Sequence, residues 1–408
     1  MPKRKNEQDF LEDLIRCHLR RPEEPLTNLG NPYYNFMERL EPIVSSYQYY
    51  EFDLLEDIVI GAVSSCQTAP EDFSVFYQQL LQNIEHSFQA SAAPHYLVWP
   101  LQRALLTEDV HFGNFWLLSK KTPQELENQI SNLSGISKQK VSESLAHTQR
   151  SRSPDFMKSC LAVIRLTHQT RFVDKMAYSY AQTTTQLLRL IHISESMEND
   201  FRCSSDTGET INCHVAILSE ESSRCGHGFH WNPDLVCPIP LNFMGKQNYQ
   251  EVFLKLFPAY LASHSADSFG RQCINAHRLF QLGYQQKKKQ ENESVSLVLY
   301  MTALESLLTE DELGKRKRLA KILPQLIQIP GHTPQEIEKI VDVMYKHRSE
   351  FVHGGRAVHI KYEDDSLQIL EQAIARLFIL LADVDSRIGS VRPRQIGWKN
   401  YVNGLYTA

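Results

Sequence analysis

The sequence DDSLQILEQAIARLFILLADVDSRI, residues 364 to 388, carries apolar side chains at steps of three and four along its whole length. This spacing places them on one face of an α-helix, and a continuous apolar face has to be buried against other helices. Toward the N-terminus, four further stretches with helical patterns are separated by glycine or proline, at about 268–288, 293–309, 313–328 and 333–353. The C-terminal part is therefore predicted to be an all-α helical bundle.

The sequence before this bundle has mixed patterns. Residues 1–90 are amphipathic with helical spacing, and residues 95–120 are dense in aromatic and aliphatic side chains, which favours two or three strands. Thr122 begins a capping-box pattern. Residues 138–197 return to helical spacing, with a long surface helix over the run from Phe172 to Leu190, and residues 211–220 alternate as a strand does. We predict an α+β N-terminal region followed by the bundle, in a chain that is mostly helical overall.

The domain boundary is expected in LASHSADSFG, residues 261 to 270, because this segment is small and polar. We therefore place an α+β recognition or sensor region at 1–262, the helical bundle at 263–390 and a C-terminal tail at 391–408.

Composition and charge exclude several classes of protein. The formal net charge of -5 argues against a protein that binds nucleic acid over its whole surface. No stretch approaches the ~20 apolar residues of a membrane span, and MPKRKNEQDF at the N-terminus lacks an apolar export segment. Eight cysteines in 408 residues are too few for a disulfide scaffold. We expect a cytoplasmic protein that does not contact a membrane.

The residues with chemical potential lie in YKHRSEFVHGG, residues 345 to 355, at the end of the fourth predicted bundle helix. Arg348 and His353 are about 140° apart around an ideal helix, so they share a face only if the helix ends or bends. Gly354 and Gly355 allow it to end there. A guanidinium can hold a phosphate, and an imidazole beside it can accept or donate a proton. Such a pair is suited to phosphodiester cleavage without a metal ion. The alternative is that both side chains only complement the helix dipole.

Three stretches of the bundle together resemble a known family. RSEFVHGG at 348–355, preceded by ALESLL at 303–308 and KRKRLAKILPQLI at 315–327, is similar to the HEPN superfamily and most closely to its Apea-like branch. The resemblance implies a HEPN-like bundle that dimerises, brings two Arg-His pairs into one cleft and cuts RNA without metal. It implies that His353 is the general base or acid and that Arg348 clamps the phosphate.

The match covers about residues 268–390, and from it we predict a metal-independent HEPN endoribonuclease that needs no cofactor for catalysis. The Apea-like resemblance implies anti-phage defence or an abortive response, with RNA as substrate, a homodimer through the bundle, and a regulatory protein or phage-derived trigger as partner. The N-terminal region would then sense or regulate. Two alternatives remain, a non-catalytic HEPN module that dimerises or binds RNA, and a toxin component silenced by a partner.

Two further residues are assigned to the site through the resemblance. Ser349 occupies the position after the arginine, where active family members often have Asn, Asp or His and where the Apea-like branch resembles this chain in having serine. Glu305 matches an acidic residue of the second helix that could orient the histidine or pair with Arg348. A solvated carboxylate on a helix face is the alternative for Glu305.

Basic residues are concentrated in the bundle. Residues 287 to 361 contain 13 Lys and Arg against 10 Asp and Glu, a local net charge of +3. Because phosphate contacts supply most non-specific affinity for nucleic acid, we predict that one run binds RNA. This run is Lys315, Arg316, Lys317 and Arg318, and a second run begins at Lys287. For each of these residues, a solvated helix face is the alternative.

Cysteine and histidine are concentrated between residues 203 and 237. Such ligands suit tetrahedral zinc, and a structural zinc site is a further hypothesis. The preferred ligands, which bracket the strand-like INCHVAILSE, are Cys213, Cys225, His227 and Cys237. The cysteines lack the closely paired spacing typical of zinc sites, so ordinary thiols and surface imidazoles are the alternative.

Overall fold

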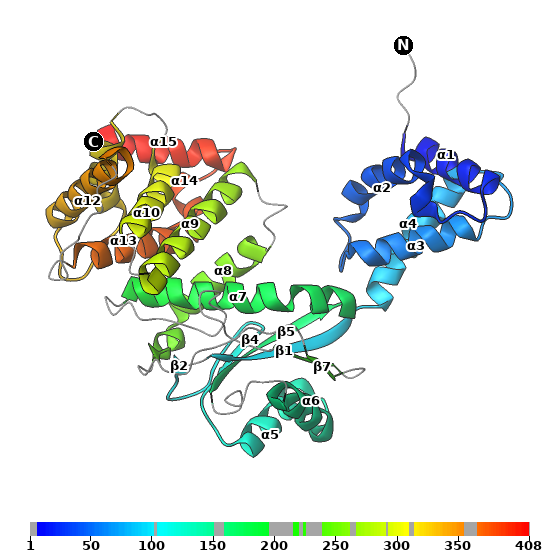
Figure 1. The fold of residues 1–408 in the computed structure, drawn as a ribbon, viewed down its shortest axis with the longest axis horizontal. Coiled ribbons are helices and arrows are strands. Elements are labelled where there is room, and N and C mark those ends of the chain that lie inside the picture. The colour runs from blue at the N-terminus through cyan, green and yellow to red at the C-terminus, as the bar shows by residue number, and fades with distance from the viewer. Residues whose placement is uncertain are drawn as a thin grey trace, which may run out of the picture. The chain divides into compact units, whose positions relative to one another are not determined.

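The computed structural model (Figure 1) describes residues 6–101, 104–150, 159–195, 215–219, 223–225, 239–261, 267–290, 293–309, 314–354 and 365–407. Side chains are described within these ranges except at 147–150, 223–225, 239–240 and 288–290. The chain divides into two compact units. The first consists of Met1–Tyr96, Arg165–Met176 and Ser219–Glu221, and the second consists of Leu97–Ile164, Ala177–Leu218 and Ser222–Ala408. The predicted boundary at 262–263 lies outside the described residues, and the domain assignment stays a prediction.

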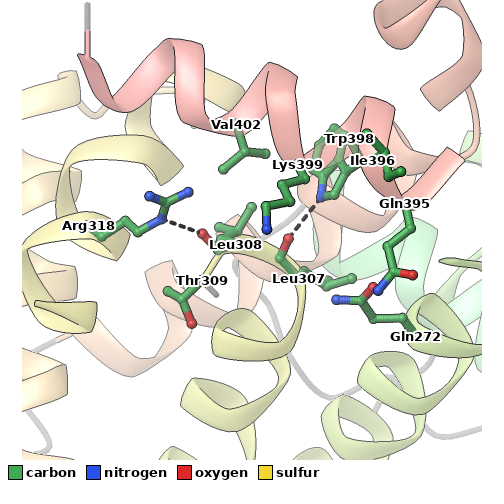
Figure 2. A pocket seen from close by; sticks show the side chains of 10 residues that line it. All are labelled: Gln272, Leu307, Leu308, Thr309, Arg318, Gln395, Ile396, Trp398, Lys399 and Val402. Carbon is green, nitrogen blue, oxygen red and sulfur yellow. Dashed lines mark hydrogen bonds between the residues drawn. The ribbon is translucent and has the colours of Figure 1, made fainter. Parts of the chain in front are cut away.

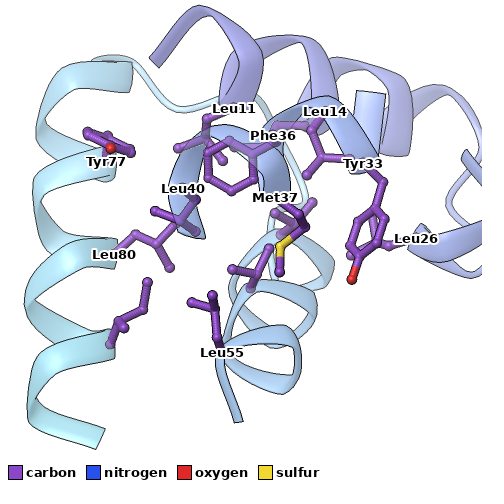
Figure 3. Packing of buried hydrophobic residues seen from close by; sticks show 14 of the residues in the cluster. Leu11, Leu14, Leu26, Tyr33, Phe36, Met37, Leu40, Leu55, Tyr77 and Leu80 are labelled. Carbon is purple, nitrogen blue, oxygen red and sulfur yellow. The ribbon is translucent and has the colours of Figure 1, made fainter. Parts of the chain in front are cut away.

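The first unit is built from four helices, which confirms the helical prediction for the first ninety residues. They are α1 (Glu7–Arg20), α2 (Asn31–Val44), α3 (Phe52–Ser64) and α4 (Phe73–Ala90), with a short 3-10 helix at Leu26–Leu29. Each helix turns an apolar face inward because its apolar residues recur at three- and four-residue steps. Figure 3 shows these side chains meeting in one core, among them Leu11, Phe36, Leu55 and Leu80.

Most of a six-stranded sheet belongs to the second unit. Its strand order is β3-β4-β5-β1-β6-β7, and the pairs β3–β4, β4–β5 and β6–β7 are antiparallel. The strands are β1 (Ala93–Leu101), β3 (Val110–Phe112), β4 (Phe115–Leu118), β5 (Cys160–His168), β6 (Ala216–Leu218) and β7 (Ser223–Cys225). A separate parallel pair joins β2 (Ala104–Leu105) to β8 (Ile239–Pro240). The strands predicted within 95–120 and 211–220 are confirmed.

The helical prediction for residues 138–197 is wrong over β5. The first five side chains of this strand, from Cys160 to Ile164, are all buried. A short unbroken apolar run does not distinguish a buried strand from a buried helix by its periodicity. β5 lies between β4 and β1, so strand pairing on both sides decides its conformation.

Helices pack around this sheet. The predicted capping box begins α5 (Pro123–Ser134), where the Glu125 carboxylate accepts a hydrogen bond from the Thr122 N–H at 2.9 Å. α6 (Lys138–Arg150), α7 (Thr170–Glu195) and α8 (Gln247–Leu261) follow. α7 was predicted as a surface helix, but every residue from Leu187 to Ser194 is buried. This half of α7 contacts the C-terminal helices, because Arg189 donates a hydrogen bond to Gln281 of α9 at 2.7 Å and Gln372 of α13 donates one to the Ser194 carbonyl oxygen at 3.2 Å.

The five predicted C-terminal helices are confirmed, with one division. They are α9 (Ser268–Gln290), α10 (Glu293–Leu308), α11 (Lys315–Leu326), α12 (Pro334–Gly354) and the predicted final helix, which divides into α13 (Ser366–Leu381) and α14 (Val384–Ile388). Among the described residues, none of the helices combines the length and apolar character needed to cross a membrane.

The segment after residue 390 is not a tail over its described part. It forms α15 (Arg394–Thr407), which buries Trp398 and Val402. These two residues are four positions apart and therefore lie on one face of the helix. The Trp398 indole N–H also donates a hydrogen bond to the Leu307 carbonyl oxygen at 2.8 Å, so α15 is attached to the end of α10.

Candidate functional site

Helix α12 carries three of the predicted site residues, Arg348, Ser349 and His353. It begins with a capping box, in which the Glu336 carboxylate accepts a hydrogen bond from the Thr333 N–H at 2.7 Å. Its buried residues follow at steps of four and three, at Ile337, Val341 and Met344. Arg348 is the next position on this face, which explains why its side chain is only 20% exposed.

On this face Arg348 meets Glu305 of α10, whose side chain is 11% exposed. The Arg348 Nη2 and Glu305 Oε1 atoms are 3.6 Å apart, and the Lys315 Nζ, at the start of α11, is 3.5 Å from Glu305 Oε2. Burial, together with a hydrogen bond to Glu305, raises the pKa of Tyr345 to about 12. The Arg348 guanidinium lies 5.6 Å from the centre of the Tyr345 ring. We call Glu305, Lys315, Tyr345 and Arg348 the Glu305 cluster.

The hydrogen-bonding capacity of the Glu305 cluster is not filled. Both Arg348 Nε and Glu305 Oε1 are buried atoms without a hydrogen-bond partner in the described part of the chain. The two ion-pair distances exceed the ~2.7–2.9 Å of a charge-assisted hydrogen bond. With two cations and one carboxylate, the cluster has a formal charge of +1. It is therefore able to attract an anion to the exposed parts of Lys315 and Arg348, which are 28% and 20% exposed.

His353 lies in the last turn of α12, as predicted, because the helix continues through Gly354. The same continuity places it about 140° around the helix from Arg348. The His353 side chain is exposed, and so is its neighbour Val352, at 48%. Ser349 is half-buried. A single chain thus brings Arg348 and Glu305 together and turns His353 to a different side of the helix.

The four residues of the predicted RNA-binding run, 315–318, differ in their contacts. Lys315 belongs to the Glu305 cluster, and Arg316 forms a two-pronged ion pair with Asp342 of α12. Lys317 is exposed and has no ion pair within the residues that the structure describes. Of these three, Lys317 alone has the environment of a solvated basic side chain.

Arg318 lines a pocket of about 400 Å³ at the C-terminal end of α10 (Figure 2). Its Nε donates a hydrogen bond to the Leu308 carbonyl oxygen at 3.0 Å, next to the bond from Trp398 to Leu307. Carbonyl groups in the last turn of a helix have no helical N–H to bind. Arg318 supplies one of the missing donors, so it holds the end of α10.

The predicted zinc ligands cannot be placed. Cys213, His227 and Cys237 lie outside the described residues, and Cys225 ends β7, of which only the backbone is described. The part of the chain that is described contains no group of three or more His, Cys, Asp or Glu side chains arranged to hold a metal ion. The zinc site stays a prediction.

Tyr345 is a member of the cluster that the sequence interpretation missed. It precedes Arg348 by three positions, which places both on one face of α12, and this spacing was the available signal. Lys315 was predicted only as a general RNA contact. Its pairing with Glu305 joins the start of one helix to the body of another, so it depends on tertiary packing.

No family model and no curated protein matches this sequence, and no solved structure matches this fold. A function is therefore inferred from the residues and the geometry described above.

Proposed function

We propose that the chain is a metal-independent endoribonuclease and that α9 to α14 form a HEPN-like bundle. The observation that carries the proposal is the state of Arg348. It lies in a partly exposed, positively charged cluster with an unused N–H, five residues before an exposed histidine in the last turn of the same helix. A partly exposed guanidinium can bind two oxygens of a phosphate. The resemblance of residues 348–355 to the HEPN motif supplies the reaction.

In the proposed reaction, the His353 imidazole takes the proton of a ribose 2′-hydroxyl, and the 2′-oxygen attacks the adjacent phosphorus. The bond from phosphorus to the 5′-oxygen of the next nucleotide breaks, and an imidazolium protonates this leaving oxygen. The products are a 2′,3′-cyclic phosphate, or a 3′-phosphate after hydrolysis, and a 5′-hydroxyl. Arg348 stabilises the negative charge that accumulates on the phosphate oxygens.

A homodimer is part of this proposal because Arg348 and His353 lie on different sides of α12. A two-fold axis through the bundle can set the histidine of one chain beside the arginine of the other. Val352, which is 48% exposed, offers apolar surface next to His353 for such a contact. Ser349 would then lie between the two groups along the helix.

RNA cleavage by the purified chain in the presence of a chelator, with end-group mapping, tests the proposal. Arg348→Ala and His353→Ala should each abolish cleavage without changing the circular dichroism spectrum. His347→Ala is the matched control, since His347 is on the same helix and its Nδ1 lies 3.7 Å from a carboxylate oxygen of Glu350. It should retain cleavage. Products with 5′-phosphate and 3′-hydroxyl ends would contradict the imidazole mechanism.

A non-catalytic RNA-binding module is the second candidate, because Arg348 already has Glu305 as an ion-pair partner, as structural arginines do. This candidate predicts that the unmodified chain and the His353→Ala variant both bind RNA and that neither of them cleaves it. A toxin silenced by a partner would instead cleave only after the partner is removed. The role that goes with the nuclease proposal is anti-phage defence in the cytoplasm, with the N-terminal region sensing a trigger.

A further inference from the structure

Lys315 and Arg348 share one carboxylate, which leaves a positive charge without a counter-ion in the cluster. Glu305 lies 3.5 Å from the Lys315 Nζ and 3.6 Å from the Arg348 Nη2, so a single negative charge stands against two cations. Lys315 is 28% exposed and Arg348 is 20% exposed, and both can therefore be reached from solvent. Neither ion pair is short enough to be a charge-assisted hydrogen bond.

We propose that Lys315 is a second cationic contact for the RNA backbone, and that Glu305 positions Lys315 and Arg348 side by side for it. This inference rests on the proposed function and extends it from one phosphate-binding side chain to two on different helices. The Arg348 side chain is 20% exposed, so a phosphate oxygen can reach the guanidinium from solvent, whereas its Nε is itself a buried atom. A neighbouring phosphate oxygen then comes within reach of the Lys315 ammonium.

Glu305 has two opposite effects in this arrangement. Its charge keeps both cations at the junction of α10, α11 and α12. The same charge repels an incoming phosphate. Glu305 is therefore a positioning residue that lowers affinity for RNA while it orders the cations.

The experiment measures RNA binding separately from cleavage. The chain carrying His353→Ala is titrated onto a fluorescent, single-stranded 2′-O-methyl RNA at increasing salt, and the dissociation constant and its salt dependence are recorded. In this background, Lys315→Gln is compared with Lys339→Gln. Lys339 is an exposed lysine of α12, nine positions from Arg348 and so on the opposite face of that helix. Both substitutions remove the same charge.

Lys315→Gln should weaken binding about fivefold at ~0.1 M salt and lower the salt slope by about 0.7, the contribution of one phosphate contact on a single strand. Lys339→Gln should change neither, and Glu305→Gln should tighten binding. Equal effects of Lys315→Gln and Lys339→Gln, or no effect of Lys315→Gln, would overturn the inference. If binding depends on Lys315 but the chain with His353 intact cleaves no RNA, the nuclease proposal is contradicted and the inference about Lys315 stands.

Discussion

Replacing Glu371 by leucine should destabilise the C-terminal helices strongly. Glu371 lies on α13 and is fully buried. Its carboxylate accepts hydrogen bonds from the Lys287 Nζ at 3.0 and 3.1 Å and from the Tyr300 hydroxyl at 2.7 Å. Lys287 is only 13% exposed, and Tyr300 is fully buried. Glu371→Leu therefore leaves an ammonium group and a hydroxyl group in the interior without this acceptor.

The expected loss follows from these two orphaned groups. Breaking a buried ion pair by removing one partner costs about 3–5 kcal/mol. An unsatisfied buried hydroxyl costs about 1–3 kcal/mol, and because the two effects overlap we expect a loss of about 4–6 kcal/mol in total. The double variant Lys287→Met, Glu371→Leu should recover most of this loss, since a buried ion pair replaced by apolar side chains is often neutral or stabilising.

Hydrogen exchange of peptides from α10 and α13 at increasing urea measures the free energy of unfolding of these helices alone. Asp383→Ala is the surface control. Asp383 pairs with Lys255 at 3.2 Å, but both side chains are more than half exposed, so little change is expected. The reasoning is refuted if Glu371→Leu costs less than about 1 kcal/mol, the scale of an exposed pair, or if the double variant is no more stable than the single one.

Three further predictions concern pH, assembly and metal. Burial lowers the pKa of His277 to about 3 in the folded chain. In the unfolded chain the histidine pKa is near 6.5, so the unfolded chain binds the proton more readily. The free energy of unfolding should therefore fall as the pH drops below about 6.5. The expected loss between pH 7 and pH 5 is about 2 kcal/mol, measured by the same exchange experiment, and His277→Gln should remove this dependence. Light scattering should give the mass of a dimer at micromolar concentration, and a strict monomer with and without RNA would remove the composite site. Elemental analysis of untagged protein should show about one zinc per chain if Cys213, Cys225, His227 and Cys237 form a site, whereas metal-free protein would leave them as ordinary thiols and imidazole.

The helices were predictable because their signals are local. The capping box at Thr122 and the stripe from Leu367 to Ile388 lie within single segments, and periodicity identifies both. β5 and α15 were missed for a physical reason. The apolar run in β5 becomes a strand by pairing with β4 and β1, which lie far from it in sequence. Trp398 attaches α15 to α10, which is likewise distant in sequence.

Buried polar residues were the hardest to predict. Lys287 begins a run of three lysines that suggested a solvated or RNA-binding face, yet its ammonium group is paired with Glu371 in the interior. The sequence spacing does not show which member of a basic run points inward. The same limit applied to the candidate site, where Arg348 was identifiable from its motif while Lys315 joined it only through a tertiary contact with Glu305.

The position of Glu305 depends on elements that the motif does not contain. Glu305 lies one turn before the end of α10, and its carbonyl oxygen accepts the Thr309 N–H at 3.0 Å. The carbonyl groups that follow, at Ser306, Leu307 and Leu308, are bound by Gln272 of α9, Trp398 of α15 and Arg318 of α11. These bonds satisfy carbonyl groups that the end of α10 leaves without helical partners, and so hold the backbone of the turn that carries Glu305. The backbone position of Glu305 therefore depends on α9, α11 and α15 as well as on α10, which explains why the last helix of the chain matters to a site whose motif ends about forty residues earlier.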